Sequence, residues 1–92
     1  MNRDSSNFTE IAVDAPKWAM GAQLIQLLKK IFDAQIIYTA EGPDSRRWTL
    51  LIRGKNIIID QWDTGDISIF VPQNDVELLT LIKNAVKDIN PP

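Results

Sequence analysis

The amino-acid sequence predicts a single α+β domain of two layers, in which a mainly antiparallel sheet of about five strands carries two helices on one face. The 92 residues are enough for one hydrophobic core and too few for two. Apolar residues recur every three to four positions near each end of the chain and every second position across its middle. The expected order of elements is therefore β-α-β-β-β-β-α, within one domain of residues 1–92 that has frayed ends at 1–6 and 91–92.

The N-terminal part of the domain is predicted to form a strand and then a helix. Residues 8–13 have the composition of a short strand, which adds to an edge of the sheet. Asp14 is expected to cap the helix and Pro16 to occupy its first turn, so that the helix covers about 16–32. Gly21 is expected to allow close packing of this helix on the sheet. The apolar stripe of the helix consists of Trp18, Ala22, Leu24, Ile25, Leu28, Ile31 and Phe32.

The middle of the chain is predicted to form an antiparallel meander. Four segments rich in β-branched and aromatic residues follow one another, and turns that contain glycine join them. The strands are expected at 36–41, 47–53, 56–62 and 66–71, and the turns at 42–45, 54–55 and 63–65.

A second helix is predicted at the C-terminal end. Pro72 ends the last strand, Asn74 is suited to cap a helix, and Glu77 stands where a capping box places its acidic partner. The helix is expected to continue to about residue 89, where the prolines that follow end it. Its buried stripe would consist of Val76, Leu79, Ile82, Val86 and Ile89.

The length of each turn predicts which side chains share a face of the sheet. The two-residue turn at 54–55 places Ile52 opposite Ile57. The three-residue turn, which contains Gly65, places Ile59 opposite Ile67 or a near neighbour. The face that both helices are expected to cover then carries Trp48, Leu50, Ile52, Ile57, Ile59, Ile67, Ile69 and Val71.

The opposite face, called face two below, mixes apolar and charged side chains. Antiparallel sheets with one solvated face usually carry mostly polar residues there. Here Leu51 is expected to lie opposite Ile58, and Ile58 opposite Phe70, so that the three form a contiguous apolar strip. The predicted members of face two are Arg47, Thr49, Leu51, Arg53, Ile58, Asp60, Trp62, Asp66, Ser68 and Phe70.

Face two is interpreted as a protein-binding surface, because a monomer rarely leaves such a strip exposed. Trp62 and Phe70 would be its aromatic anchors, and Leu51 and Ile58 its apolar centre. The partner is expected to be a second copy of the chain, in a homodimer, or a larger protein. In the alternative interpretation, the N-terminal segment that includes Phe8 folds across this face. The charged rim of the surface would consist of Arg47, Arg53, Asp60 and Asp66.

The residue types that perform most protein chemistry are missing from the chain. There is no cysteine and no histidine, which removes disulfides, thiolate nucleophiles, the commonest metal ligand and the usual proton carrier at neutral pH. We therefore expect no enzyme activity, no catalytic residues, no cofactor and no metal. The alternative is carboxylate chemistry at one hairpin, which carries Asp60, Asp63 and Asp66.

A second functional hypothesis is a small-ligand-binding domain with a pocket between the first helix and the sheet. Such a pocket would be sought where aromatic side chains gather on the inner surfaces of both elements. The residues that would line it are Trp18, Phe32, Tyr38 and Trp48.

Charge and hydropathy argue against two further classes of partner. The net charge is −2 and the basic residues are scattered, whereas nucleic-acid binders cluster them. The segment Arg46-Arg47-Trp48 mixes basic and aromatic residues, but Trp48 falls on the core-facing side. The polar N-terminus and the absence of an apolar run of about 18 residues predict no membrane segment and a cytoplasmic location.

Overall fold

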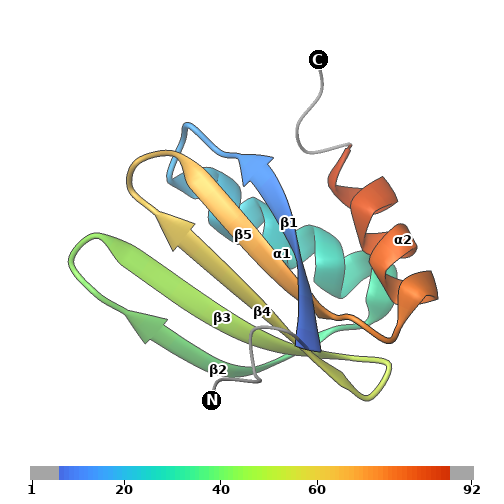
Figure 1. The fold of residues 1–92 in the computed structure, drawn as a ribbon. Helices are drawn as coiled ribbons and strands as arrows, with labels where there is room; N and C mark the ends of the chain where they lie inside the picture. The colour runs from blue at the N-terminus through green and yellow to red at the C-terminus, as the bar shows by residue number, and fades with distance from the viewer. Residues whose placement is uncertain (1–6, 88–92) are drawn as a thin grey trace.

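The structure, a computed structural model, describes residues 7–87 of the chain. These residues form an open antiparallel sheet with two helices on one side. The sheet order is β1-β5-β4-β3-β2. Figure 1 shows both helices on the same side of the sheet. The predicted fold class and order of elements are therefore confirmed. The elements are β1 (Phe8–Asp14), α1 (Ala19–Phe32), β2 (Gln35–Glu41), β3 (Ser45–Ile52), β4 (Lys55–Trp62), β5 (Asp66–Pro72) and α2 (Val76–Val86).

The two edges of the sheet are formed by strands that are neighbours in the sequence. β1 joins one edge by antiparallel pairing with β5, and β2 forms the other edge beside β3. α1 connects them and so carries the chain from one border of the sheet to the other (Figure 1). This connection leaves the backbone of β2 unpaired on its outer side within the described residues.

The first helix begins later than the sequence predicts, because Asp14 belongs to β1 and does not cap a helix. Asp14 pairs with Asp66 of β5 in the sheet. The ladder continues one residue further, since the Ala15 N–H donates to the Gly65 carbonyl at 2.8 Å. Trp18 occupies the N-cap position of α1 without a side-chain hydrogen bond. Pairing with β5 therefore prevails over the local capping signal.

The second helix is capped by the neighbour of the predicted residue. The Asp75 carboxylate accepts a hydrogen bond from the Leu78 N–H at 3.0 Å, so the capping box predicted for Asn74 and Glu77 is wrong. Val76 was expected in the buried stripe, yet it lies in the first turn of α2 and is 68% exposed. Of the other predicted positions, Ile82 and Val86 are buried, Leu79 is half-buried, and Ile89 lies outside the described residues.

The hydrophobic core lies between the helices and the predicted inner face of the sheet. Seven of the eight residues predicted for that face are fully buried, and Trp48 is half-buried at its border. The stripe predicted for α1 was too wide, because Trp18, Ala22 and Ile31 are exposed. The core side chains of the helices are mainly Leu24, Ile25, Leu28, Leu78 and Ile82.

The two hairpin turns keep the predicted faces but change the predicted partners. The first two-residue turn consists of Arg53 and Gly54, both at positive φ as a type I′ turn requires, and not of residues 54–55. The pairing shifts by two residues, so Leu51 lies opposite Asn56 and not opposite Ile58. Because side chains alternate along a strand, a shift of two leaves each of them on its expected face.

The second hairpin has the expected three-residue loop, with Gly65 at a φ of 105°. Trp62 pairs with Asp66 across it, and Ile59 lies opposite Ile69, one same-face position beyond Ile67. The predicted pairing of Ile58 with Phe70 is confirmed.

A partly buried cluster around Arg46 and Gln61 fixes the start of α1 on the sheet. The Arg46 guanidinium lies between the rings of Trp18 and Trp48, with centroid distances of 4.2 and 4.7 Å. It also donates to the Gln61 side chain at 2.8 Å. A Cβ on Gly21 would overlap the Gln61 amide, so this glycine permits the close approach that the sequence suggests.

Candidate interaction surface

The strand register assigns the members of face two, because paired residues in an antiparallel sheet point to the same side. Its side chains form transverse rows that cross the strands from β1 to β2. The end row consists of Asp14, Asp66, Trp62 and Ser45. The trough row consists of Ala12, Ser68, Asp60, Arg47 and Ala40. The belt consists of Glu10, Phe70, Ile58, Thr49 and Tyr38.

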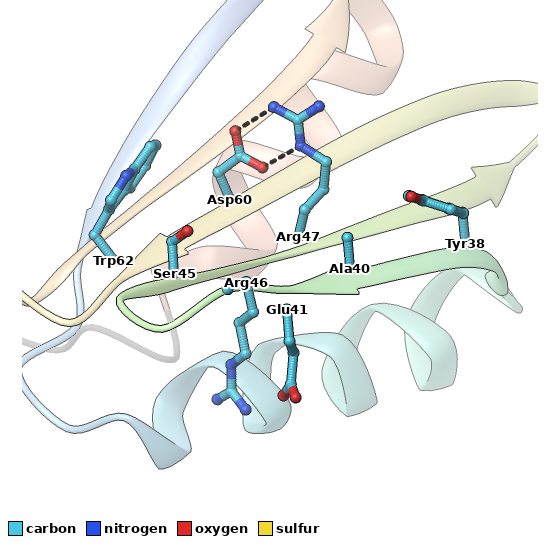
Figure 2. A pocket seen from close by; sticks show the side chains of 9 residues that line it. Tyr38, Ala40, Glu41, Ser45, Arg46, Arg47, Asp60 and Trp62 are labelled. Atoms are coloured by element: carbon cyan, nitrogen blue, oxygen red, sulfur yellow. Dashed lines mark hydrogen bonds and ion pairs between the residues drawn. The ribbon is translucent and has the colours of Figure 1, made fainter.

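An ion pair occupies the middle of the trough row. The Nε and Nη2 atoms of Arg47 donate to the two carboxylate oxygens of Asp60 at 2.6 and 2.8 Å (Figure 2). Asp60 is 8% exposed, whereas half of the Arg47 side chain is open to solvent. The hydrogen bond to Asp60 raises the pKa of the Arg47 guanidinium, with the Asp60 charge adding to the effect and burial opposing it. A paired carboxylate of this kind is not free to act as a general base.

Two hollows lie along face two, on either side of Trp62. The first has a volume of about 400 Å³ and is bordered by Tyr38, the ion pair and Trp62 (Figure 2). The second, of about 440 Å³, is bordered by Trp62, Asp14 and other residues of β1 and β5. They follow the trough row because three of its side chains are small: Ala12, Ser68 and Ala40. Trp62 therefore stands as a ridge between two depressions.

No helix or strand among residues 7–87 covers face two, because both helices pack on the other side (Figure 1). Trp62 is 38% exposed and Tyr38 59%, whereas Leu51, Ile58 and Phe70 are half-buried by their neighbours. Phe8, which one interpretation placed across this face, lies in β1 opposite Pro72 and shares the face of Glu10, whereas residues 1–6 of the same N-terminal segment lie outside the described residues. The apolar side chains of the belt, Phe70 and Ile58, lie on β5 and β4, the β3 member of the belt is Thr49, and Leu51 lies one row away.

Face two carries acidic residues on β1 and β5 at one edge, and its basic residue on β3 toward the other edge. Asp14 and Asp66 lie directly opposite each other on β1 and β5, and Glu10 lies further along β1. Within residues 7–87, neither aspartate forms an ion pair. The basic group of the face is Arg47 on β3. Like charges that face each other across a ladder are destabilising, so a cation placed over this corner is favourable.

Arg53 is the one predicted rim residue that the structure separates from the others. It occupies the turn between β3 and β4, and its guanidinium lies 4.0 Å from the Glu77 carboxylate of α2. Because α2 covers the inner face, this contact directs Arg53 toward the helices and away from face two.

The other candidate sites of the sequence are dispersed. In the described part of the chain, no group of three side chains is arranged to hold a metal ion. Asp60 is held by Arg47, and Asp66 accepts a hydrogen bond from Thr64 at 3.3 Å. None of the helices among residues 7–87 is both long and apolar enough to cross a lipid bilayer.

The residues proposed for a ligand pocket do not gather around one space. Figure 2 shows Tyr38 on the side of the sheet that faces away from α1, whereas Arg46 and Glu41 point toward the helix. The space between Trp18 and Trp48 is filled by the Arg46 guanidinium.

Sequence reasoning missed the edge strand β2 as a surface. Every residue of this strand except Ala40 is exposed, including Ile36, Ile37 and Tyr38 at 41%, 50% and 59%. The Ile-Ile-Tyr run predicted a strand, but its position at an edge depends on the order of all five strands. No sequence signal distinguishes it from a central strand.

Comparisons with known proteins add no relative to these observations. The chain was compared with family models, with curated proteins and with solved structures, and none of the three comparisons returned a match.

Proposed function

We propose that the protein is a non-catalytic, cytoplasmic interaction module that self-associates by laying face two of one copy on face two of a second. The observation that carries this proposal is the belt of Phe70, Ile58 and Thr49, which crosses three adjacent strands without a covering element among residues 7–87. Apolar side chains on an uncovered face, here the half-buried Phe70 and Ile58 with the exposed Trp62, are typical of interaction sites. Trp62, on its ridge between two hollows, is suited to be the central anchor.

A two-fold axis along β4 is the arrangement that suits the charges best. β4 is the middle strand, so this axis lays β5 over β3 of the second copy and β1 over β2. Trp62, Asp60 and Ile58 then meet their own counterparts, and each Asp60 carboxylate keeps the Arg47 guanidinium of its own copy as its partner. Asp66 lies over Ser45 of the second copy, one row from Arg47 of the second copy, and Glu10 lies over Tyr38 of the second copy. The acidic side of each face is thereby matched with the basic side of the other.

The size of the face is compatible with a specific interface. With strands about 4.8 Å apart and a rise of about 3.3 Å per residue, a sheet of this size covers roughly 500 Å² on each copy. The two copies together would bury about 1,000 Å², which is the lower limit for a specific protein interface. We therefore expect a dimer that dissociates on dilution.

Sedimentation velocity across a range of concentrations tests the proposal. Trp62→Arg adds a cation where the axis brings two copies of the side chain together, and it is expected to raise the dissociation constant of the face-two dimer at least about tenfold. The double variant Trp62→Arg, Phe70→Asp is expected to remove this dimer. Val76→Arg is the matched control, because it adds the same charge at an exposed apolar residue of α2.

Circular dichroism shows whether each variant is folded. The single variant keeps the test valid if the double variant does not fold, since Trp62 lies outside the core. A folded Trp62→Arg protein whose association equals that of the unaltered chain would show that face two is not the interface.

A further inference from the structure

We infer that the β2 edge is a second homotypic interface, at which β2 of one copy pairs antiparallel with β2 of another. The two edges of the sheet differ in protection. β1 carries Glu10 and Asp14 and is contacted by α2. β2 has a charge only at its last residue, Glu41, and it exposes two isoleucines and a tyrosine. Natural edge strands usually carry charges, prolines, bulges or a cover that prevents pairing with other chains, and of these β2 has a bulge at Ile37 and the charge of Glu41.

The bulge in β2 determines the register of this pairing. Ile36 lies opposite Leu50 and Tyr38 opposite Thr49, so Ile37 is the extra residue of the bulge. Beyond the bulge, the residues from Tyr38 to Glu41 pair with β3 without a further shift. A two-fold axis through Thr39 brings Ile37 and the regular stretch into one ladder, whereas an axis through Ala40 would give a shorter ladder and an axis through Tyr38 would extend it across the bulge.

The side chains are compatible with a second copy in this register. Thr39 lies against Thr39 of the second copy, and the Tyr38 ring covers Ala40 of the second copy on face two. Ile37 lies opposite Glu41 of the second copy on the helix side. The two Glu41 carboxylates are then at opposite ends of the ladder, whereas parallel pairing would bring them together. The single charge of the strand therefore favours an antiparallel second copy as the occupant.

Pairing at the edge has a consequence that goes beyond the proposed function. Its two-fold axis stands perpendicular to the sheet at β2, whereas the axis of the face-two dimer runs along β4, two strands away. Because the two axes do not meet, copies that are joined alternately through the two interfaces form an open chain of molecules and not a closed ring. The unaltered chain is expected to form species larger than a dimer as its concentration rises.

Substitution of Ile37 tests the edge and its register together. Ile37→Glu places a carboxylate opposite Glu41 of the second copy at both ends of the ladder, and it is expected to limit the chain to the face-two dimer. Ile37→Lys places a cation at the same two positions and is expected to retain the larger species. Val76→Glu and Val76→Lys are the matched controls, because they make the same charge changes at an exposed apolar residue of α2.

Sedimentation velocity distinguishes this inference from the proposed face-two dimer. Trp62→Arg alone is expected to leave an edge dimer, and Trp62→Arg with Ile37→Glu a monomer. In the Trp62→Arg protein, hydrogen exchange of the amides of residues 37–41 is expected to slow as concentration rises. Equal association of Ile37→Glu and the unaltered chain would overturn the edge interface and leave face two intact. If Ile37→Glu and Ile37→Lys lost the larger species to the same extent, the register centred on Thr39 would be overturned.

Discussion

The two faces of the same sheet use the alternation of strand residues in different ways. Toward the helices, Leu50, Ile57, Ile59 and Ile69 form an apolar layer that is fully buried. On face two, the same strands present half-buried apolar residues in one row and an ion pair with small side chains in the next. The difference indicates that burial by helices, and not the sheet itself, decides how uniform a face becomes. A face without a cover keeps charges at the positions where a core would exclude them.

Neighbouring isoleucines on β4 provide the strongest test of this comparison. Ile59→Ala is expected to lower the free energy of unfolding by about 3 kcal/mol, because it leaves a cavity in a packed core. Ile58→Ala on face two is expected to cost the monomer only about 1 kcal/mol, since its side chain is half-buried and no element among residues 7–87 packs over it. Urea unfolding at low protein concentration measures both values. Equal losses would mean that face two is as well packed as the core.

The ion pair of face two is expected to behave partly like a core contact. Arg47→Ala leaves the nearly buried Asp60 carboxylate without its partner and is expected to lower the free energy of unfolding by about 2 kcal/mol. The hydrogen bond to Asp60 raises the pKa of Arg47, and a raised pKa stabilises the fold at every pH below the ordinary value of that group. The contribution of the guanidinium should therefore persist from neutral into alkaline pH.

Arg47→Lys is the control for the geometry of this pair. Lysine keeps the charge but cannot form the two parallel hydrogen bonds, so an intermediate loss is expected. Urea unfolding at pH 7 and at pH 9 measures the free energy of unfolding of the unaltered chain, of Arg47→Ala and of Arg47→Lys. A loss for Arg47→Ala that matches the value for an ordinary surface residue would show that the pair adds nothing to stability.

The smallest expected effect separates folding from association. Asp66→Asn removes the repulsion between Asp66 and Asp14 and is expected to stabilise the monomer by about 0.3 kcal/mol. The same change removes the attraction between Asp66 and Arg47 of the second copy, so the face-two dimer should become weaker. Thermal unfolding and sedimentation velocity measure the two effects. A change that strengthens both would contradict the proposed placement of the two-fold axis.

Much of the fold could be predicted because its signals are local and repeated. The period of two along 47–71, together with the turn residues, was enough to assign the inner face correctly, even though the turn at Arg53 and Gly54 moved the register. An error of two residues leaves a face unchanged, whereas an error of one would have reversed it. Helix starts were less accurate, because Asp14 satisfies both a capping pattern and a place in the sheet.

The sequence predicted which residues belong to face two better than it predicted which of them contact one another. Ile58 and Phe70 are adjacent as expected, but Arg53 points toward α2, and Tyr38, an expected pocket residue, belongs to the belt instead. The pairing of Arg47 with Asp60 follows from a register that differs by two from the expected one. Side-chain partners across strands depend on that register, and the sequence did not determine it.

The sequence by itself determined the α+β class, the order of the elements, the apolar inner face and the presence of a mixed outer face. These properties depend on the period of hydrophobic residues and on turn chemistry, which act over a few residues. Only the tertiary structure decided that β1 and β2 are the two edges, that the nearly buried Asp60 pairs with Arg47, and that Ile36, Ile37 and Tyr38 are exposed. The physical reason is that edges and cross-strand partners depend on how distant segments pair, and no short stretch of sequence encodes that pairing.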